Sequence, residues 1–321
     1  MKEVLNLLLI EMDIGMLIME LRRCYMNYYD EIKHKIINCE IYSKVRDYSR
    51  DRNKLQVYFE IGKLLSLAGK EYGKNIIKQF SDRLVVEVGK KYNDRTLRRI
   101  RQFYEVFCDE NWSTLWTKLT WSHYREVLVL KDINAIRYYL NLCENNNLTQ
   151  RQLHELILND EYGRLDVAAR NKIINSEKVH VGDLIPNPII INNYVSCERF
   201  DEYALKQTII VCLDSFLSQL GFGFTYVGNE YRIKFADKYN YIDLLLFNVE
   251  YNCYVVVELK ATELKKEHIG QIQVYMNYID QNIKKSFHDT TIGVIICKKE
   301  NKYIIEYSSD NRIVAREYKL V

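Results

Sequence analysis

The segment 241–261, "YIDLLLFNVEYNCYVVVELKA", indicates the fold of the C-terminal part of this chain. Two apolar runs flank the turn-like tetrapeptide "VEYN", a pattern typical of two antiparallel strands joined by a short connection. Both runs nevertheless contain ionisable side chains, namely Asp243, Glu258 and Lys260. Burying an ionised side chain costs several kcal/mol unless a partner compensates for the lost hydration. These charges therefore need an explanation beyond strand formation.

The pairing register of this hairpin predicts that the two acids meet. If the turn centres between Glu250 and Tyr251, Asp243 lies opposite Glu258, and opposed side chains on one sheet face are about 5 Å apart. Because successive strand residues point to opposite faces, Glu258 and Lys260 share one face. Two carboxylates at this separation repel each other unless a cation lies between them.

A divalent metal ion would satisfy this arrangement. Magnesium prefers oxygen ligands and commonly uses one or two carboxylates together with phosphate oxygens and water. We therefore expect Asp243 and Glu258 to bind Mg²⁺ or Mn²⁺, and Lys260 to orient a water molecule or offset charge on a phosphate. This chemistry is metal-assisted phosphodiester hydrolysis. The alternative is a structural cluster in which Lys260 only neutralises an acid at a strand end.

The length of 321 residues is typical of two domains. Apolar residues recur at intervals of three and four before residue 165, which predicts helices. Pro186 and Pro188 disfavour helix and mark a joint. The expected fold class is α+β, with an all-α domain over 1–165, a linker region over 166–196 and an α/β domain over 197–321.

The C-terminal domain is expected to be a small layered α/β structure around the hairpin. Its predicted elements are a helix over 201–220, a strand over 224–235, a helix over 265–282, and strands over 291–298 and 302–308.

Composition sets weaker bounds on function. The net charge of +3 is too small to indicate a nucleic-acid partner by itself. Eight cysteines without a CxxC pair favour reduced thiols in a cytoplasmic protein. The segment 1–23 is apolar, but four acidic residues interrupt it and no small-residue cleavage site follows. We expect an amphipathic helix that packs or mediates homo-oligomerisation, and no membrane partner.

Asp243 followed by Glu258-Leu259-Lys260 resembles the signature of PD-(D/E)XK nucleases. The wider pattern, from "YVGNEYRI" through "CYVVVELKATELKKEHIGQIQVYMNYID", is similar to the bacterial YhcG-like family of that superfamily. N-terminal motifs such as "YFEIGKLL" and "LRRIRQFYEVF" extend this resemblance from about residue 40 to the end. The resemblance implies a restriction-endonuclease-like domain with a mixed central sheet, a winged-helix-like N-terminal domain, and metal-dependent cleavage of DNA. RNA is the less favoured alternative substrate.

The resemblance also implies individual roles. Asp243 and Glu258 would be metal ligands and Lys260 the catalytic lysine. Gln271 and Tyr275 match a QxxxY pattern found on the helix after the core, where they would contact the scissile phosphate or a strand end. Residues four apart share a helix face. Helix packing is the alternative explanation for this pair.

One position departs from the family pattern. The first helix of the nuclease domain usually carries two acids, in a pattern like E-x-x-L-E, whereas here Glu202 and Leu205 precede Lys206. Glu202 would then support the metal or the lysine alone. Lys206 leaves open a catalytically silent nuclease fold that binds DNA or assembles a complex. A structural protein without nucleic-acid affinity is a further alternative, and a role in DNA repair or in defence is not distinguished.

The segment "DRTLRRIRQFYEVF" predicts a DNA-binding helix in the N-terminal domain. Its apolar residues form one stripe, while Arg95, Arg98 and Arg101 lie on another face. With Asp94 as the N-cap, it resembles the second helix of a helix–turn–helix. Lys74 adds positive charge nearby in the sequence. The alternative is a solvated basic face with no partner.

Overall fold

The computed structural model describes residues 27–41, 50–73, 75–108, 119–192, 201–235, 237–306, 308 and 310–321. The chain forms two compact units, Met1–Ile157 and Leu158–Val321. The segment 1–23 and Lys74, both of which carried sequence-based predictions, lie outside the described residues. None of the described helices combines the length and the apolar character needed to cross a membrane.

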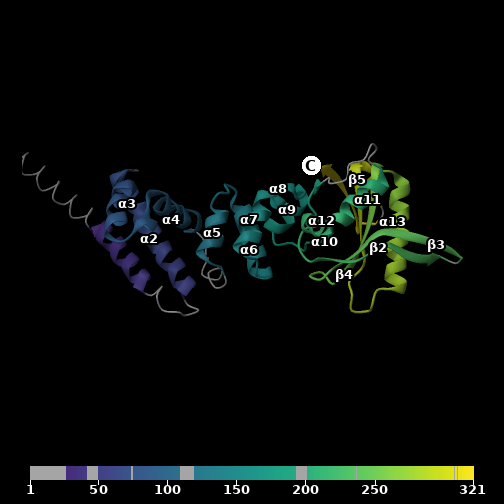
Figure 1. Ribbon diagram of the computed structural model, residues 1–321, viewed down its shortest axis with the longest axis horizontal. Helices are drawn as coiled ribbons and strands as arrows, with labels where there is room; N and C mark the ends of the chain where they lie inside the picture. Colours follow the sequence, from purple (N-terminus) through teal and green to yellow (C-terminus); the bar gives the residue numbers. More distant parts are fainter. Residues whose placement is uncertain are drawn as a thin grey trace, which may run out of the picture. The chain divides into compact units, whose positions relative to one another are not determined.

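Unit 1 is helical, as predicted (Figure 1). A helix covers 27–41. It is followed by α2 (Arg50–Tyr72), α3 (Ile76–Glu87), the 3₁₀ helix η1 (Lys90–Tyr92), α4 (Asp94–Phe107), α5 (Trp121–Val127), α6 (Ile133–Asn146) and α7 (Gln150–Leu158). The described residues of this unit contain no strand, so the wing of a winged helix is absent from them.

Helix α4 packs closely against α2 at Gly62. A Cβ atom added to Gly62 would lie 2.5 Å from the carbonyl oxygen of Ile100, so the lack of a side chain permits this approach. The N-cap of α4 is Asn93 and not Asp94: Asn93 has an extended backbone, and its side chain accepts a hydrogen bond from Thr96 N at 3.1 Å. Asp94 already lies in the first turn of the helix.

Unit 2 contains a six-stranded sheet in the order β1-β6-β5-β4-β3-β2. Its strands are β1 (Ile189–Ile191), β2 (Phe224–Phe235), β3 (Lys238–Asn248), β4 (Cys253–Glu263), β5 (Ile292–Lys299) and β6 (Ile313–Leu320). Its helices are α8 (Glu161–Arg164), α9 (Val167–Ile174), α10 (Val181–Leu184), α11 (Glu202–Val211), α12 (Leu213–Leu220), α13 (Lys266–Asn282) and α14 (Lys302–Glu306). Strands β2, β3 and β4 pair antiparallel, and β4, β5, β6 and β1 pair parallel. The sheet is therefore mixed, as expected.

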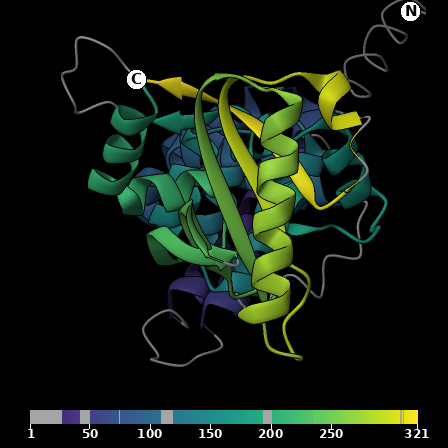
Figure 2. The same cartoon turned by 90° about the vertical axis from the view of Figure 1, so that its right-hand side faces the viewer.

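Helices cover both faces of this sheet. Leu205 and Ile209 of α11 and Phe216 of α12 pack with Val257 and Leu259 on one face. Helix α13 lies across the other face, where it is seen in front of the strands in Figure 2. The single helix predicted over 201–220 is interrupted at Cys212, which separates α11 from α12.

The predicted linker 166–196 is structured over its described residues 166–192. Its described part, 166–192, forms α9, α10 and β1, and β1 pairs with β6 as the edge strand of the sheet. The buried Arg316 donates hydrogen bonds to the carbonyl oxygens of Ile185 and Gly182 at 2.7 and 2.8 Å. The prolines disfavour a helix, but proline is equally compatible with the approach to an edge strand.

The strand predicted over 302–308 is also wrong, because Lys302–Glu306 forms the short helix α14. Ile304 and Ile305 are adjacent in sequence, yet both pack against the apolar cluster beneath α13. A strand would point adjacent side chains to opposite faces, whereas one helical turn can direct both inward. The strand that completes the sheet is instead β6.

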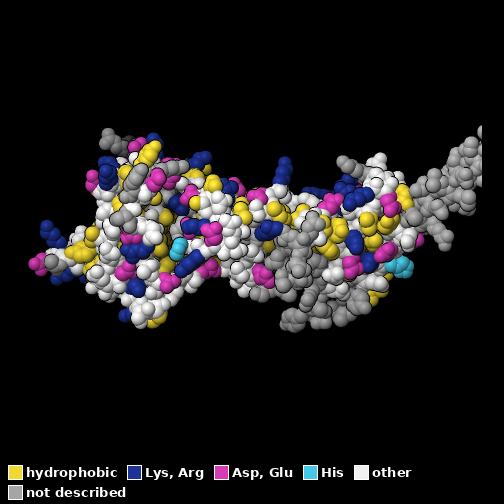
Figure 3. All heavy atoms as spheres, turned by 180° about the vertical axis from the view of Figure 1, so that it is seen from behind, with side chains coloured by type: hydrophobic (Ala, Val, Ile, Leu, Met, Phe, Trp, Pro, Cys, Tyr) yellow, Lys and Arg dark blue, Asp and Glu magenta, His cyan; other side chains and the backbone are white. Residues whose placement is uncertain are grey.

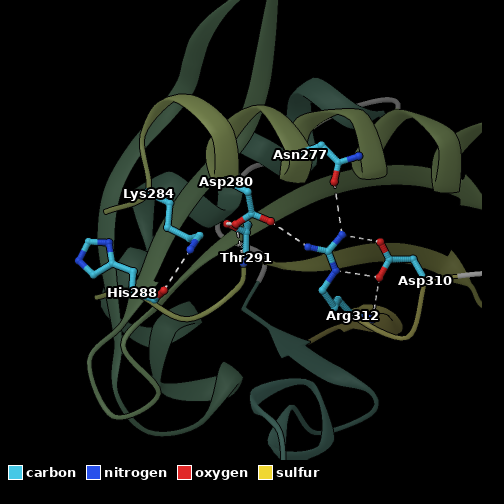
Figure 4. Close-up of polar contacts among 7 residues, drawn as sticks. All are labelled: Asn277, Asp280, Lys284, His288, Thr291, Asp310 and Arg312. Atoms are coloured by element: carbon cyan, nitrogen blue, oxygen red, sulfur yellow. Dashed lines mark hydrogen bonds and ion pairs between the residues drawn. The ribbon is translucent and has the colours of Figure 1, made fainter. Parts of the chain in front are cut away.

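A polar network holds the C-terminal end of α13 against the sheet (Figure 4). Asp280 accepts hydrogen bonds from the backbone N and the hydroxyl of Thr291 at 3.0 and 2.7 Å, just before β5. Arg312 donates to Asp280 at 2.8 Å and to both oxygens of Asp310. These bonds connect the C-terminal end of α13 to the residue before β5 and to the residue before β6.

Candidate active site

The hairpin of β3 and β4 has the predicted register. Leu244 pairs with Val257, and the ladder of paired residues ends there. The next position of the same register places Asp243 opposite Glu258. There the Oδ2 atom of Asp243 accepts a hydrogen bond from Leu259 N at 3.0 Å, so the acid satisfies a backbone N–H where the strand pairing stops.

Glu258 is the most buried acid of the site, with only 1% of its surface exposed. Val257 and Leu259 pack beneath α11 and α12, which directs Glu258 to the other side of β4, as predicted. Burial and the charge of Asp243 raise the pKa of Glu258 to about 7, although Lys260 opposes this shift. Its Oε1 atom is buried without a hydrogen-bond partner. Such an atom destabilises the fold unless something else binds it.

Lys260 lies beside Glu258 and near the start of α11. Its Nζ atom is 3.4 Å from Glu258 Oε2 and 3.8 Å from Glu202 Oε2. Glu202, in the first turn of α11, is therefore positioned to orient Lys260. Glu202 pairs with this lysine.

Lys206 is the cation in contact with Asp243. Its Nζ atom lies 2.7 Å from Asp243 Oδ1 and 3.4 Å from Glu230 Oε1. Burial alone would lower the pKa of Lys206, but the two carboxylates outweigh burial and raise it, so the ammonium remains charged. Glu230 comes from β2, where it adopts a left-handed backbone with φ of 46°.

Two residues near the site were not singled out from the sequence. Glu230 follows Gly228 and Asn229, and glycine within a strand pattern is a signal of an irregularity that redirects side chains. His268 lies in the first turn of α13, where its Nδ1 accepts a hydrogen bond from Lys265 N at 3.2 Å. Burial and the nearby charge of Lys260 lower the pKa of His268, which favours a neutral imidazole.

Gln271 and Tyr275 share a face of α13, as predicted from their spacing. The Nε2 atom of Gln271 donates to the hydroxyl of Tyr275 at 3.2 Å. Tyr275 is buried in the apolar cluster beneath α13, whereas Gln271 is partly exposed. Packing therefore accounts for Tyr275, and Gln271 is the member of the pair that a substrate can reach.

The two acids fit a single divalent ion with few protein ligands. No group of three or more His, Cys, Asp or Glu suited to a metal occurs within the described part of the chain. Glu258 nevertheless offers a partnerless buried oxygen, and each engaged oxygen of Asp243 keeps a second lone pair. Two carboxylates supplemented by water and phosphate oxygens are a common ligand set for Mg²⁺.

The predicted DNA-contacting arginines of α4 differ in their surroundings. Arg98 pairs with Asp94 at 2.8 Å, and Arg101 pairs with Glu105 at 3.2 Å, both one helical turn apart. Exposed pairs of this kind contribute little stability, and the partner acid offsets part of the positive charge. Two of the three predicted arginines are therefore partly neutralised within their own helix.

Arg95 is exposed and belongs to a cluster of positive charge that the sequence pattern did not indicate. Burial and the charges of Arg95 and Arg125 lower the pKa of Arg99, although Glu126, which pairs with Arg125, opposes this shift. Arg125 comes from α5, far enough along the chain that the helical periodicity of α4 could not include it.

The family comparisons agree with this site. Residues 183–321 match the family model described as the YhcG PDDEXK nuclease domain, and residues 32–164 match the DUF1016 N-terminal domain. The chain therefore combines a YhcG PDDEXK nuclease domain with a DUF1016 N-terminal domain, and the resemblance noted in its sequence is confirmed.

Individual relatives are more distant. The Escherichia coli K12 protein named "Putative nuclease YhcG" is 23% identical over 288 residues, which cover 78% of this chain and 77% of that protein. A repair endonuclease from Pyrococcus abyssi is 13% identical over 39% of this chain, with a TM-score of 0.26. The EndoMS–dsDNA2 complex is 15% identical over 40% of this chain, with a TM-score of 0.27. The matched parts span 49% and 47% of those two structures.

Proposed function

We propose that this protein hydrolyses phosphodiester bonds of DNA with a bound Mg²⁺ or Mn²⁺ ion. The observation that carries this proposal is the meeting of Asp243 and Glu258 at the end of the β3–β4 ladder, with a buried partnerless oxygen on Glu258 and Lys260 beside it. Glu258 has a raised pKa and a buried oxygen without a hydrogen-bond partner, and a bound dication would relieve both.

Each residue has a defined task in this proposal. Asp243 and Glu258 hold the ion, which when bound polarises the phosphate and lowers the pKa of a water ligand. Lys260, oriented by Glu202, places a positive charge where negative charge develops on the phosphate and positions the attacking water. Gln271 contacts the substrate strand, and Tyr275 fixes the orientation of Gln271.

We further propose that unit 1 binds the DNA backbone through α4. Arg95 is the least neutralised of the three predicted arginines, and Arg99 lies near it, whereas Arg125 pairs with Glu126 at 3.6 Å. Arg98 and Arg101 contribute once phosphates compete with their partner acids. Lys74 would extend the same surface. Contacts of this kind supply sequence-independent affinity that weakens with salt.

The proposed location is the cytoplasm. The six described cysteines, at 39, 108, 143, 212, 253 and 297, are all free thiols, which suits a reducing compartment. Self-association through the segment 1–23 remains a proposal.

Incubation of the full chain with plasmid, linear and branched DNA, with Mn²⁺ or with EDTA, tests the proposal. We expect the unsubstituted protein to cleave DNA with Mn²⁺ and not with EDTA. Asp243→Ala and Glu258→Ala should lose this cleavage, while their circular dichroism spectra remain like that of the unsubstituted protein. Unchanged cleavage by both variants would refute the assignment.

The second candidate function is a catalytically silent nuclease fold that binds DNA. It is favoured by the contact of Lys206 with Asp243, because an ammonium already neutralises one of the two acids. Binding of DNA without nicking, at any Mn²⁺ concentration, would support this candidate.

A further inference from the structure

The hairpin of β2 and β3 has two chemically different faces. Arg232 pairs with Tyr241 and Lys234 pairs with Tyr239, and paired residues of antiparallel strands point to the same side. All four side chains are exposed, including 53% of Tyr239 and 54% of Tyr241. The opposite face packs against α13 through Tyr231, Ile233, Phe235 and Ile242. The exposed face is therefore an aromatic and basic strip, defined here as Arg232, Lys234, Tyr239 and Tyr241.

Cations and rings within this strip are already in contact. The guanidinium of Arg232 lies 4.9 Å from the ring centre of Tyr239, and the ammonium of Lys234 lies 5.8 Å from it. Within the described residues of this hairpin, the ion pairs are those of Glu230 and Asp243 with Lys206. The two cations of the strip are thus not neutralised by an acid, and the ring of Tyr239 is held by them.

The strip leads to the candidate active site. Tyr239 and Tyr241 precede Asp243 on β3, and Tyr241 is two residues from it, about 7 Å along the strand. The hairpin extends beyond the rest of the sheet in Figure 1. Its tip, at the left edge of Figure 3, carries hydrophobic and basic side chains beside an acidic one. A nucleic-acid strand that passes Asp243 would continue along this strip.

We propose that the strip binds an unpaired segment of the DNA strand next to the scissile phosphate. Exposed tyrosines combined with basic residues are the usual arrangement for single strands, because every base has a face that stacks on an aromatic ring. Bases within a duplex are covered by their neighbours and cannot stack in this way. Residues two apart on one strand face are about 7 Å from each other, so each ring can accept its own base. The inference rests on the proposed nuclease function and specifies its substrate as DNA with a single-stranded segment.

Binding measurements in EDTA test this inference without cleavage. Fluorescence anisotropy compares the full chain on a duplex with a single-stranded overhang and on a blunt duplex of equal mass. Loss of aromatic stacking costs about fivefold to a hundredfold in affinity per base. The double variant Tyr239→Ala/Tyr241→Ala should bind the overhang DNA with an affinity lower by a factor in this range. Its affinity for the blunt duplex should change by less than twofold.

Matched variants identify the cause of any loss. Tyr239→Phe/Tyr241→Phe keeps both rings and should retain overhang binding. Tyr303→Ala removes another exposed tyrosine, 74% accessible and located on α14, and should have no effect. A 2-aminopurine placed in the overhang should be quenched by the unsubstituted protein and by the phenylalanine variant, but not by the alanine variant. Equal affinity and equal quenching in the alanine variant would overturn the inference.

The outcome separates this inference from the proposed function. Ring-dependent overhang binding by a protein that cleaves no DNA with Mn²⁺ would support the strip and refute the nuclease. Cleavage that remains, with overhang binding independent of both rings, would refute the strip and leave the nuclease intact. Absence of any overhang binding by the unsubstituted protein would also overturn the inference.

Discussion

The Nζ atom of Lys206 lies 2.7 Å from Oδ1 of Asp243, at the helix position where the family resemblance implies a second acid. Lys206 thus places a positive group next to the expected ion. Asp243 and Glu258 therefore each have a lysine beside them, and an ion bound there would share Asp243 with an ammonium group.

Removing this ammonium should strengthen metal binding and weaken the metal-free fold. In Lys206→Met, the dication no longer experiences repulsion from a nearby cation, and we expect Mn²⁺ affinity to rise roughly tenfold. Without metal, Asp243 and Glu258 lose a neutralising charge, so the melting temperature should fall. Isothermal titration calorimetry and thermal melts with and without Mn²⁺ measure both effects.

Lys206→Arg is the matched control, because it retains the positive charge and should resemble the unsubstituted protein in Mn²⁺ affinity. A Lys206→Met variant with unchanged affinity would show that the ammonium does not compete with the ion.

The raised pKa of Glu258 predicts a specific dependence of stability on pH. The carboxyl group of Glu258 binds its proton more tightly in the folded state than in the unfolded state, where its pKa is near 4.5. Its stabilising contribution is therefore complete below pH 4.5 and is lost as pH rises through about 7. In Glu258→Gln this loss disappears. Between pH 5 and pH 8, the unfolding free energy of the metal-free protein should fall by about 2–3 kcal/mol more than that of the variant.

Urea unfolding at several pH values in EDTA measures this difference. The other titrating groups are common to both proteins and cancel in the comparison. Parallel pH profiles for the two proteins would contradict a raised pKa at Glu258.

The surroundings of the α4 arginines predict unequal roles in DNA binding. Arg95→Ala should weaken binding to duplex DNA and lower the slope of log affinity against log salt by about one. Arg98→Ala should have a smaller effect, because Asp94 already engages this guanidinium. Fluorescence anisotropy at increasing KCl concentrations gives both slopes.

Arg151→Ala on α7 is the control for a loss of charge alone. Arg151 is exposed and pairs with Glu155 one helical turn away, as Arg98 pairs with Asp94. Equal effects of Arg95→Ala and Arg151→Ala would mean that α4 has no special part in binding.

Arg316 should be essential to the stability of unit 2. Its buried guanidinium satisfies the carbonyl oxygens of Gly182 and Ile185, and Arg316→Met leaves both without this donor. We expect a loss of roughly 3 kcal/mol or more in unfolding free energy. Urea unfolding checks this value, and hydrogen exchange should show lost protection in 182–191.

Lys319→Met changes an exposed cation of the same strand and should be nearly neutral. Normal protection of 182–191 in Arg316→Met would show that this segment does not depend on the arginine.

The parts of the fold that the sequence predicted are those with a strong local pattern. The β3–β4 register followed from a short turn between two apolar runs, and α13 followed from its periodicity. Strand β1 is three residues long, and α14 contains the β-branched pair Ile304-Ile305, so local composition misleads there. The fold of such short segments is decided by contacts with distant residues, Arg316 among them.

The same division applies to the site. Asp243, Glu258 and Lys260 could be predicted because they interrupt apolar strands within one hairpin. The ion pair of Lys206 with Asp243 joins α11 to β3, and Glu230 reaches it through an irregular backbone. Neither contact is local in the sequence, so neither could be derived from spacing.

The direct test of the account is anomalous scattering from a crystal soaked with Mn²⁺. We predict a peak within ligand distance of both Asp243 and Glu258, and none in a Glu258→Gln crystal soaked in the same way. A soaked crystal without this peak, in which Lys206 still contacts Asp243, would contradict the metal-dependent mechanism.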